Sequence, residues 1–173
     1  LKSLTWVRVS IAGATDATYE KIHQCRKGDL ERVLQNMENM VAVKRDQQLS
    51  TTLGAQLLLL PENKDEVVQL AKIVRGFGFD YFTVKPFSQH PLSKAKLQVD
   101  YSEAEEIGHE LKEYETDDFK IYFRSRSIEN LGMEKPYDEC GGMHFMASMD
   151  AAGGVFPCRV FLARDGAVYG TIH

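Results

Sequence analysis

The segment Leu53-Gly54-Ala55-Gln56-Leu57-Leu58-Leu59-Leu60 is short, almost wholly apolar and stopped at once by Pro61. A continuous apolar run of this length is typical of a strand in a parallel sheet that helices cover. Residues 64–75 follow with apolar side chains at helical spacing, and residues 80–84 form another apolar run. Strand, helix and strand in this order predict a parallel pair joined by a right-handed crossover.

The same alternation continues on both sides of this unit. Towards the N-terminus, residues 5–11 predict a buried strand, Asp16 the N-cap of a helix, and residues 29–43 a longer helix with one apolar face. Towards the C-terminus, residues 101–114 predict a helix and residues 119–123 a strand. The fold class predicted is α/β with a parallel sheet, and an open doubly wound sheet and part of a barrel both fit this order.

The character of the sequence changes near residue 126. Turn formers and charged residues dominate residues 125–142. Residues 143–149 and 155–161 then predict two short strands, and the two glycines of the connection Asp150-Ala151-Ala152-Gly153-Gly154 favour a hairpin turn. We therefore expect two domains, residues 1–125 and residues 126–173.

Composition excludes several classes of protein. The 173 residues include 43% hydrophobic and 27% charged side chains, with a formal net charge of −4 and no run of Lys and Arg, so we do not expect a nucleic-acid partner. No apolar stretch approaches the roughly 20 residues of a membrane span, and no signal-type leader precedes Thr5. We expect a cytoplasmic chain without a membrane partner, and an internal piece of something longer.

Polar residues gather where the predicted strands end, which is where parallel α/β proteins bind ligands. Ser10 lies near the end of the first strand and Glu62-Asn63 follows the second. The segment Lys85–His90 places a Lys, a Ser, a Gln and a His directly after the third strand, and Arg124 follows the fourth.

The three cysteines, Cys25, Cys140 and Cys158, are few and odd in number, which argues against a disulfide scaffold. The predicted hairpin would bring Cys140 and Cys158 together, and paired thiolates suit zinc or an iron–sulfur cluster. Two free buried cysteines are the plainer alternative. A zinc site completed by His144 and His173 is a further alternative.

Several of these segments together resemble the radical S-adenosylmethionine enzymes. Val7-Arg8-Val9-Ser10-Ile11 with Thr18–Ile22 resembles the family's fourth strand and following helix, Gln56–Asn63 its fifth strand, and Asp80–Pro91 its sixth. Cys140 through Cys158, containing Asp150-Ala151-Ala152-Gly153-Gly154-Val155-Phe156-Pro157-Cys158, is similar to the start of the SPASM or twitch extension. Tyr169–Ile172 resembles the short segment that comes next in that extension.

The resemblance implies a fold and a chemistry. The fold would be the C-terminal half of a partial (β/α) barrel followed by a small β-hairpin iron–sulfur extension. In this family a 4Fe–4S cluster binds S-adenosylmethionine and cleaves it reductively, and the resulting 5′-deoxyadenosyl radical takes a hydrogen atom from the substrate. The substrate class stays open among small molecules, sugars and peptides.

The resemblance also implies roles for individual residues. Contacts with S-adenosylmethionine would come from Ser10, Gln56 and Lys85. Contacts with the substrate would come from Ser88, His90 and Arg124, whose planar guanidinium suits an anionic group. Ligands to an auxiliary cluster would be Cys140 and Cys158.

The sequence departs from the family in three respects. It contains no CxxxCxxC motif, which holds the radical cluster, and no cysteine follows Cys158 to complete an auxiliary one. Ala12 stands where an aspartate is frequent, and His23 near where an arginine is frequent. We therefore expect a fragment or a degenerate relative that does not cleave S-adenosylmethionine on its own.

Two alternatives belong to other classes. A buried Lys85 at the end of a strand would suit a Schiff-base lyase or aldolase. A half-barrel with an unpaired strand edge would also suit a non-catalytic interaction module that pairs with itself or with a missing N-terminal segment.

Overall fold

The computed structural model describes residues 1–89, 93, 97–131, 133–134, 137–162, 164 and 166–173. The chain divides into two compact units. The first comprises residues 1–88 and 97–132, and the second comprises residues 89–96 and 133–173. No helix among the described residues is long and apolar enough to cross a membrane.

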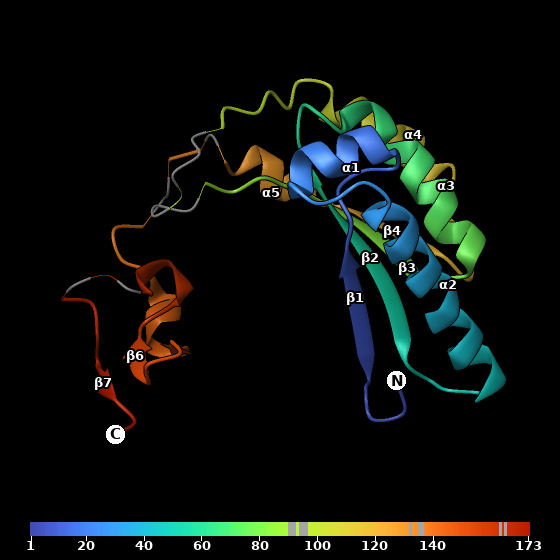
Figure 1. Cartoon of the computed structure of the whole chain (residues 1–173). Helices are drawn as coiled ribbons and strands as arrows, with labels where there is room; N and C mark the ends of the chain where they lie inside the picture. The colour runs from blue at the N-terminus through green and yellow to red at the C-terminus, as the bar shows by residue number, and fades with distance from the viewer. Residues whose placement is uncertain (90–92, 94–96, 132, 135–136, 163, 165) are drawn as a thin grey trace. The chain divides into compact units, whose positions relative to one another are not determined.

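The first unit is a four-stranded parallel sheet whose strands are connected along the chain by helices (Figure 1). Its elements in chain order are β1 (Trp6–Ser10), α1 (Asp16–His23), α2 (Asp29–Asp46), β2 (Thr52–Leu59), α3 (Val67–Phe77), β3 (Tyr81–Pro86), α4 (Ala104–Lys112), β4 (Lys120–Phe123) and the short α5 (Ser125–Glu129). The strand order β1-β2-β3-β4 confirms the predicted α/β fold with a parallel sheet.

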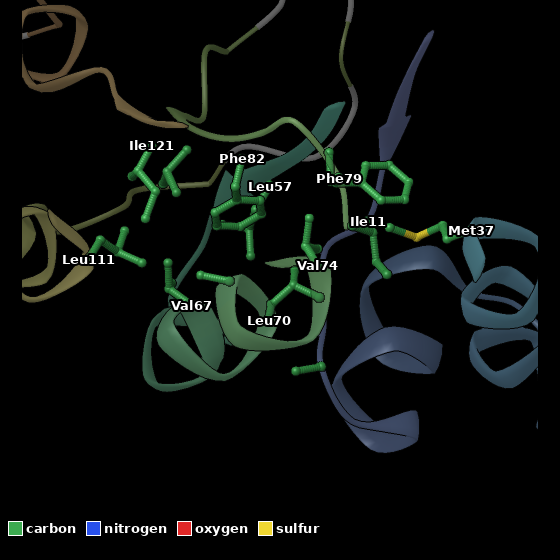
Figure 2. Packing of buried hydrophobic residues seen from close by; sticks show 14 of the residues in the cluster. Ile11, Met37, Leu57, Val67, Leu70, Val74, Phe79, Phe82, Leu111 and Ile121 are labelled. Atoms are coloured by element: carbon green, nitrogen blue, oxygen red, sulfur yellow. The ribbon is translucent and has the colours of Figure 1, made fainter. Parts of the chain in front are cut away.

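The hydrophobic core lies between one face of this sheet and helices α2, α3 and α4 (Figures 1 and 2). Side chains alternate between the two faces of a strand, so Leu57 of β2 and Phe82 of β3 both point to the helices. There they pack near Val67, Leu70 and Val74 of α3, which are fully buried. Because α3 has its apolar residues on one side, it covers the sheet with that side and leaves the other to solvent.

The opposite face of the sheet is not covered by α1 to α4 (Figure 1). In β1, Trp6, Arg8 and Ser10 are exposed, while the alternate residues are half-buried. The prediction that residues 5–11 form a buried strand is therefore wrong. The aliphatic residues Val7 and Val9 occupy the helix-facing side of β1, and the strand lies at the edge of the sheet.

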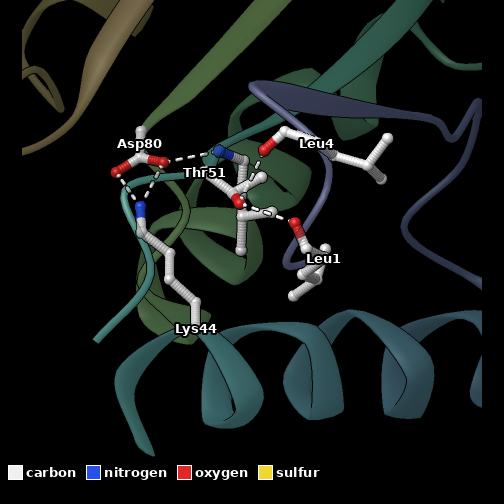
Figure 3. A network of polar contacts seen from close by, with 6 residues as sticks. Leu1, Leu4, Lys44, Thr51 and Asp80 are labelled. Atoms are coloured by element: carbon white, nitrogen blue, oxygen red, sulfur yellow. Dashed lines mark hydrogen bonds and ion pairs between the residues drawn. The ribbon is translucent and has the colours of Figure 1, made fainter. Parts of the chain in front are cut away.

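Polar contacts fix the amino ends of the strands (Figure 3). The Asp80 carboxylate just before β3 accepts hydrogen bonds from the Leu53 backbone N–H in β2 and from Lys44 Nζ in α2. The Thr51 hydroxyl bonds to the carbonyl oxygens of Leu1 and Leu4, at 3.1 and 2.9 Å. These bonds connect the first residues of the chain, α2 and two strands at one end of the sheet.

Helix α1 begins one residue earlier than the sequence indicates. Thr15, not Asp16, is the N-cap, because its hydroxyl accepts from the Thr18 backbone N–H. Asp16 is the first helical residue, where a negative charge favours the positive end of the helix dipole.

The second unit contains a small antiparallel sheet of β5 (Ser148–Met149), β6 (Gly154–Phe156) and β7 (Gly170–Thr171). The predicted hairpin is present, but its strands are much shorter than residues 143–149 and 155–161. Residues 141–144 and 159–161 are 3₁₀ turns instead. Strand β6 stops at Phe156 because Pro157 has no N–H to donate to a ladder.

Candidate functional site

The uncovered side of the parallel sheet carries most of the predicted site residues. We call it the open face and define it by the strand side chains that point away from the helices: Trp6, Arg8, Ser10, Thr52, Gln56, Leu58, Tyr81, Thr83, Lys85, Lys120 and Tyr122.

A row of polar side chains crosses the open face. Ser10 of β1 is paired in register with Gln56 of β2, Gln56 with Thr83 of β3, and Thr83 with Tyr122 of β4. Neighbouring strands lie about 4.8 Å apart, so side chains in one row are neighbours. The row therefore presents hydroxyl, amide, hydroxyl and phenol groups side by side.

Gln56 is the central residue of this row. Its Nε2 donates to Ser10 Oγ at 3.5 Å. Its Oε1 is enclosed and, among the side-chain atoms of the described residues, stands out as the one buried oxygen or nitrogen without a hydrogen-bond partner. An enclosed acceptor without a partner costs free energy, so it marks a place where a donor from outside the described residues would be favourable.

The open face is positively charged and partly aromatic. It bears three strand cations, Arg8, Lys85 and Lys120, and no Asp or Glu. The Arg8 guanidinium lies 5.5 Å from the centre of the Trp6 ring, within range of a cation–π interaction. The rings of Tyr81 and Tyr122 meet edge to face with centroids 5.7 Å apart.

A concavity of about 520 Å³ opens at the β3 and β4 side of this face. Tyr81, Thr83 and Tyr122 line it together with Arg8 from β1 and Arg124, the residue directly after β4. Arg124 is held in place through its backbone N–H, which donates to the Val84 carbonyl at 3.1 Å.

A buried asparagine holds the loops beside Ser10 and Gln56. Asn63 is 0% exposed. Its Oδ1 accepts from the Leu60 backbone N–H at 2.9 Å, and its Nδ2 donates to the carbonyls of Ala12 at 2.8 Å and Leu58 at 2.9 Å. It therefore ties the loop after β1 to the end of β2.

Glu66 makes a second tie to the loop after β1. Its carboxylate accepts from the hydroxyls of Thr15 and Thr18, at 2.7 and 2.6 Å, and from the backbone N–H groups of Ala14 and Thr15, at 2.7 and 3.1 Å. Burial by itself raises the pKa of Glu66, but these hydrogen bonds together outweigh it and bring the pKa below its ordinary value.

The structure brings some predicted residues together and separates others. Ser10, Gln56 and Lys85 all lie on the open face, and Ser10 contacts Gln56. Lys85 lies within β3 rather than after it, beside Leu58 in the ladder. Ser88 is exposed beyond the end of β3. His90 lies outside the described residues.

The hydroxyl of Tyr101 positions the segment that leads to Ser88. It accepts from the Phe87 backbone N–H at 2.6 Å and bonds to the Leu59 carbonyl at 3.4 Å. Tyr101 reaches these atoms from the segment before α4, so the ends of β2 and β3 are both tied to it.

The predicted metal ligands belong to the second unit. Cys140 is exposed before a 3₁₀ turn, and Cys158 is half-buried just after β6 and Pro157. Both are free thiols, as is Cys25. In the part of the chain that is described, no three His, Cys, Asp or Glu side chains gather closely enough to hold a metal ion.

An iron–sulfur cluster does not fit the donors of this chain alone. A radical cluster needs three thiolates from one CxxxCxxC motif and a fully ligated 4Fe–4S cluster commonly needs four, whereas the three cysteines of this sequence are isolated from one another in the chain. Cys140 and Cys158 stay a predicted pair of ligands that residues outside this sequence would have to complete.

Sequence reasoning missed Arg8, Glu66, Thr83 and Tyr122, and it noted Asn63 only as a polar residue after the second strand. A signal was available for three of them: Arg8, Thr83 and Tyr122 alternate with apolar residues in their strands, which places them on the side opposite the core. No such signal marks Glu66 or the tie from Asn63 to Ala12, because these partners lie about 50 residues away in the sequence.

Comparison with known proteins gives a fold. No protein-family model matches the chain, and no curated protein matches its sequence. Crystal structures of Streptococcus suis SuiB match it with TM-scores of 0.63 for SuiB, 0.65 for SuiB bound to S-adenosylmethionine and 0.64 for SuiB bound to the precursor peptide SuiA. The chain shares its fold with SuiB.

The likeness to SuiB is broad in extent but distant in sequence. It covers 92 to 94% of this chain at 12% sequence identity. The chain spans 38 to 39% of the length of SuiB. At this identity the match concerns the fold, and it includes most of both compact units.

Proposed function

We propose that this chain is part of a radical S-adenosylmethionine enzyme, and that the open face of its parallel sheet binds S-adenosylmethionine. Two lines of support come together. The strand-end segments resemble that family in sequence, and the fold is shared with SuiB, which has been crystallised with S-adenosylmethionine. The observation that carries the proposal is the polar row on the open face, with Gln56 Oε1 enclosed and lacking a partner among the described residues.

The residues of this row suit the polar groups of S-adenosylmethionine. Its amino and ribose hydroxyl groups are donors that Gln56 Oε1 can accept, and Ser10 Oγ offers a further hydroxyl beside it. Lys85 supplies a positive charge for its carboxylate. When bound beside a reduced 4Fe–4S cluster, S-adenosylmethionine supplies the radical that removes a hydrogen atom from a substrate.

This chain's own share of the work is binding and positioning. Asn63 and Glu66 hold the loop after β1, and so hold Ser10 in register with Gln56. Positioned groups of this kind fix a cofactor without reorganising when it binds. Since the thiolates for a radical cluster are absent from this sequence, the activity requires other segments or another chain.

A peptide is the substrate class that we propose. SuiB has been crystallised with the precursor peptide SuiA, and this chain has the same fold. The open face is wide, spans four strands and mixes aromatic with charged groups, as a surface for an extended peptide does.

Equilibrium dialysis with radiolabelled S-adenosylmethionine tests the binding proposal. We expect saturable binding that Gln56→Ala weakens by about fivefold, the value of one hydrogen bond of about 1 kcal/mol. The matched control is Gln69→Ala, which removes an exposed glutamine from α3 and should leave binding unchanged. Absence of saturable binding, or equal loss in both variants, would contradict the proposal.

Lys85 supports a second candidate, a Schiff-base lyase. It is half-buried on β3 in register with Leu58, and a lysine amine on a barrel-type strand can attack a carbonyl carbon and form a Schiff base. Borohydride reduction in the presence of an aldehyde or ketone substrate would attach the ligand covalently to Lys85. Mass spectrometry that finds no adduct on the peptide containing Lys85 would eliminate this candidate.

A further inference from the structure

The charge of the open face is opposite to that of the chain. The whole sequence has a formal net charge of −4, yet the open face carries basic residues and no acidic ones. The two guanidinium groups that line its concavity, those of Arg8 and Arg124, form no ion pair with any residue that the structure describes. Guanidinium nitrogens only donate hydrogen bonds, so both side chains are available to acceptors.

The concavity that these two arginines line contains mainly hydrogen-bond donors and aromatic rings. Tyr81 and Thr83 of β3 and Tyr122 of β4 line it, and Thr83 is 4% exposed. Lys112 of α4, Ile121 and Phe123 complete the lining, and no carboxylate contributes to the wall. An arginine guanidinium binds a carboxylate through two parallel hydrogen bonds, and tyrosine rings pack against the backbone and aliphatic parts of a peptide. The arginines come from the two outer strands of the sheet, β1 and the end of β4, so they suit carboxylates that are separated along a chain.

We infer that this concavity binds the side-chain carboxylates of an acidic segment in the substrate peptide. The inference deepens the proposed function and rests on it only in taking the bound peptide to be the substrate. A nucleic acid would need a longer basic surface than the few cations of this face provide. A short acidic peptide matches the few cations that the face provides.

Fluorescence anisotropy with a labelled peptide tests this inference on the full 173-residue chain. The probe is an acetylated and amidated octapeptide that alternates Glu with Leu, and its comparison has Gln in place of each Glu. We expect the Glu peptide to bind at least about tenfold more tightly, because charge-assisted hydrogen bonds exceed neutral ones. Raising the salt from about 50 to about 300 mM should weaken the Glu peptide selectively, since salt screens exposed charges.

Arginine variants locate the binding site. Arg8→Gln and Arg124→Gln should each weaken binding of the Glu peptide by roughly five- to tenfold. Arg8→Lys should weaken binding less, because lysine keeps the positive charge and loses only the paired hydrogen bonds of the guanidinium. Arg45→Gln, on the exposed side of α2, is the matched control and should have no effect. Trp6 is the only tryptophan and lies against Arg8, so its intrinsic fluorescence should change with the Glu peptide.

Three results would overturn the inference. The first is equal affinity for the Glu and Gln peptides. The second is an equal effect of Arg8→Gln and Arg45→Gln, with circular dichroism showing both variants folded. The third is displacement of the Glu peptide by inorganic phosphate at concentrations where acetate does not displace it, which would make this a phosphate site. S-adenosylmethionine dialysis on the same samples separates a failure here from a failure of the proposed function.

Discussion

Asn63 and Glu66 show how single residues set the geometry of the strand ends. Neither touches the open face, yet both bind the loop that follows Ser10. A buried asparagine that satisfies one backbone N–H and two carbonyls replaces the regular hydrogen bonds that loops lack. These residues therefore connect the stability of the sheet to the position of the proposed cofactor contacts.

Replacing Asn63 should be costly. Asn63→Ala leaves the Leu60 N–H and the Ala12 and Leu58 carbonyls without these bonds in a buried site. We expect the free energy of unfolding, measured by urea denaturation, to fall by about 2 to 4 kcal/mol. Asn36→Ala, an exposed position on α2, should change it by less than about 0.5 kcal/mol. Equal effects of the two substitutions would contradict this role.

Glu66 should make the stability depend on pH in one direction. Its pKa is lower in the folded chain, so it contributes stability above its ordinary pKa near 4.5, and that contribution is lost as the pH falls through the folded value. Glu66→Gln should lower the free energy of unfolding at pH 7. The difference in this free energy between the variant and the unmodified chain should shrink at acidic pH. Urea denaturation across that pH range measures it, and a constant difference would contradict the assignment.

At the scale of elements, the first unit follows from its sequence and the second does not. The apolar run of β2 and the one-sided apolar pattern of α3 predict their elements because helix packing on a sheet needs those patterns. The same patterns leave undecided which side of β1 is exposed, because that depends on what lies opposite. In the second unit, Pro157 ends β6 early, and the two-residue strand β5 is too short for any periodicity to appear.

The pairing of β2 with β3 depends on a glycine. A Cβ at Gly54 would overlap the Tyr81 ring, which covers this position on the open face. We expect Gly54→Ala to displace the ring and to lower the free energy of unfolding by about 1 to 3 kcal/mol. The loss should shrink when Tyr81→Ala is also present, because the two changes remove the same contact.

Gly76 provides the control for this test. A Cβ there would meet nothing within 4 Å, and Gly76 lies in α3, so Gly76→Ala should stabilise the chain by up to about 1 kcal/mol. Additive effects of Gly54→Ala and Tyr81→Ala in urea denaturation would contradict the close contact between β2 and β3.

At the scale of the whole molecule, the open face is the feature that sequence reasoning could not anticipate fully. The predicted contacts Ser10, Gln56 and Lys85 fall on it, because alternation along parallel strands places them there. The basic concavity was missed because Arg8 and Arg124 are far apart in the sequence and meet only in the folded sheet. The roles of all these residues stay proposals that binding experiments have to test.

The unpaired strands and the apolar groups of the open face should promote association. Among the described strands, β1 and β4 each pair on one side only, and Trp6 and Tyr122 are 57% and 54% exposed. We expect the mass in sedimentation velocity to rise with concentration, because unpaired edges and exposed apolar surface favour contacts between copies.

Two variants locate that association. Trp6→Glu should reduce it, whereas Val43→Glu, which replaces an exposed apolar residue of α2, should not. A monomer at every concentration, or equal effects of both variants, would contradict a role for the open face.

The most direct test of the central claim is to observe the Gln56 side chain while S-adenosylmethionine is added. In a chain labelled with ¹⁵N at glutamine, the Gln56 side-chain amide signals should shift and saturate, and those of Gln69 on α3 should stay fixed. Signals of Gln56 that do not move, or shifts confined to glutamines on the helices, would contradict binding of S-adenosylmethionine at the open face.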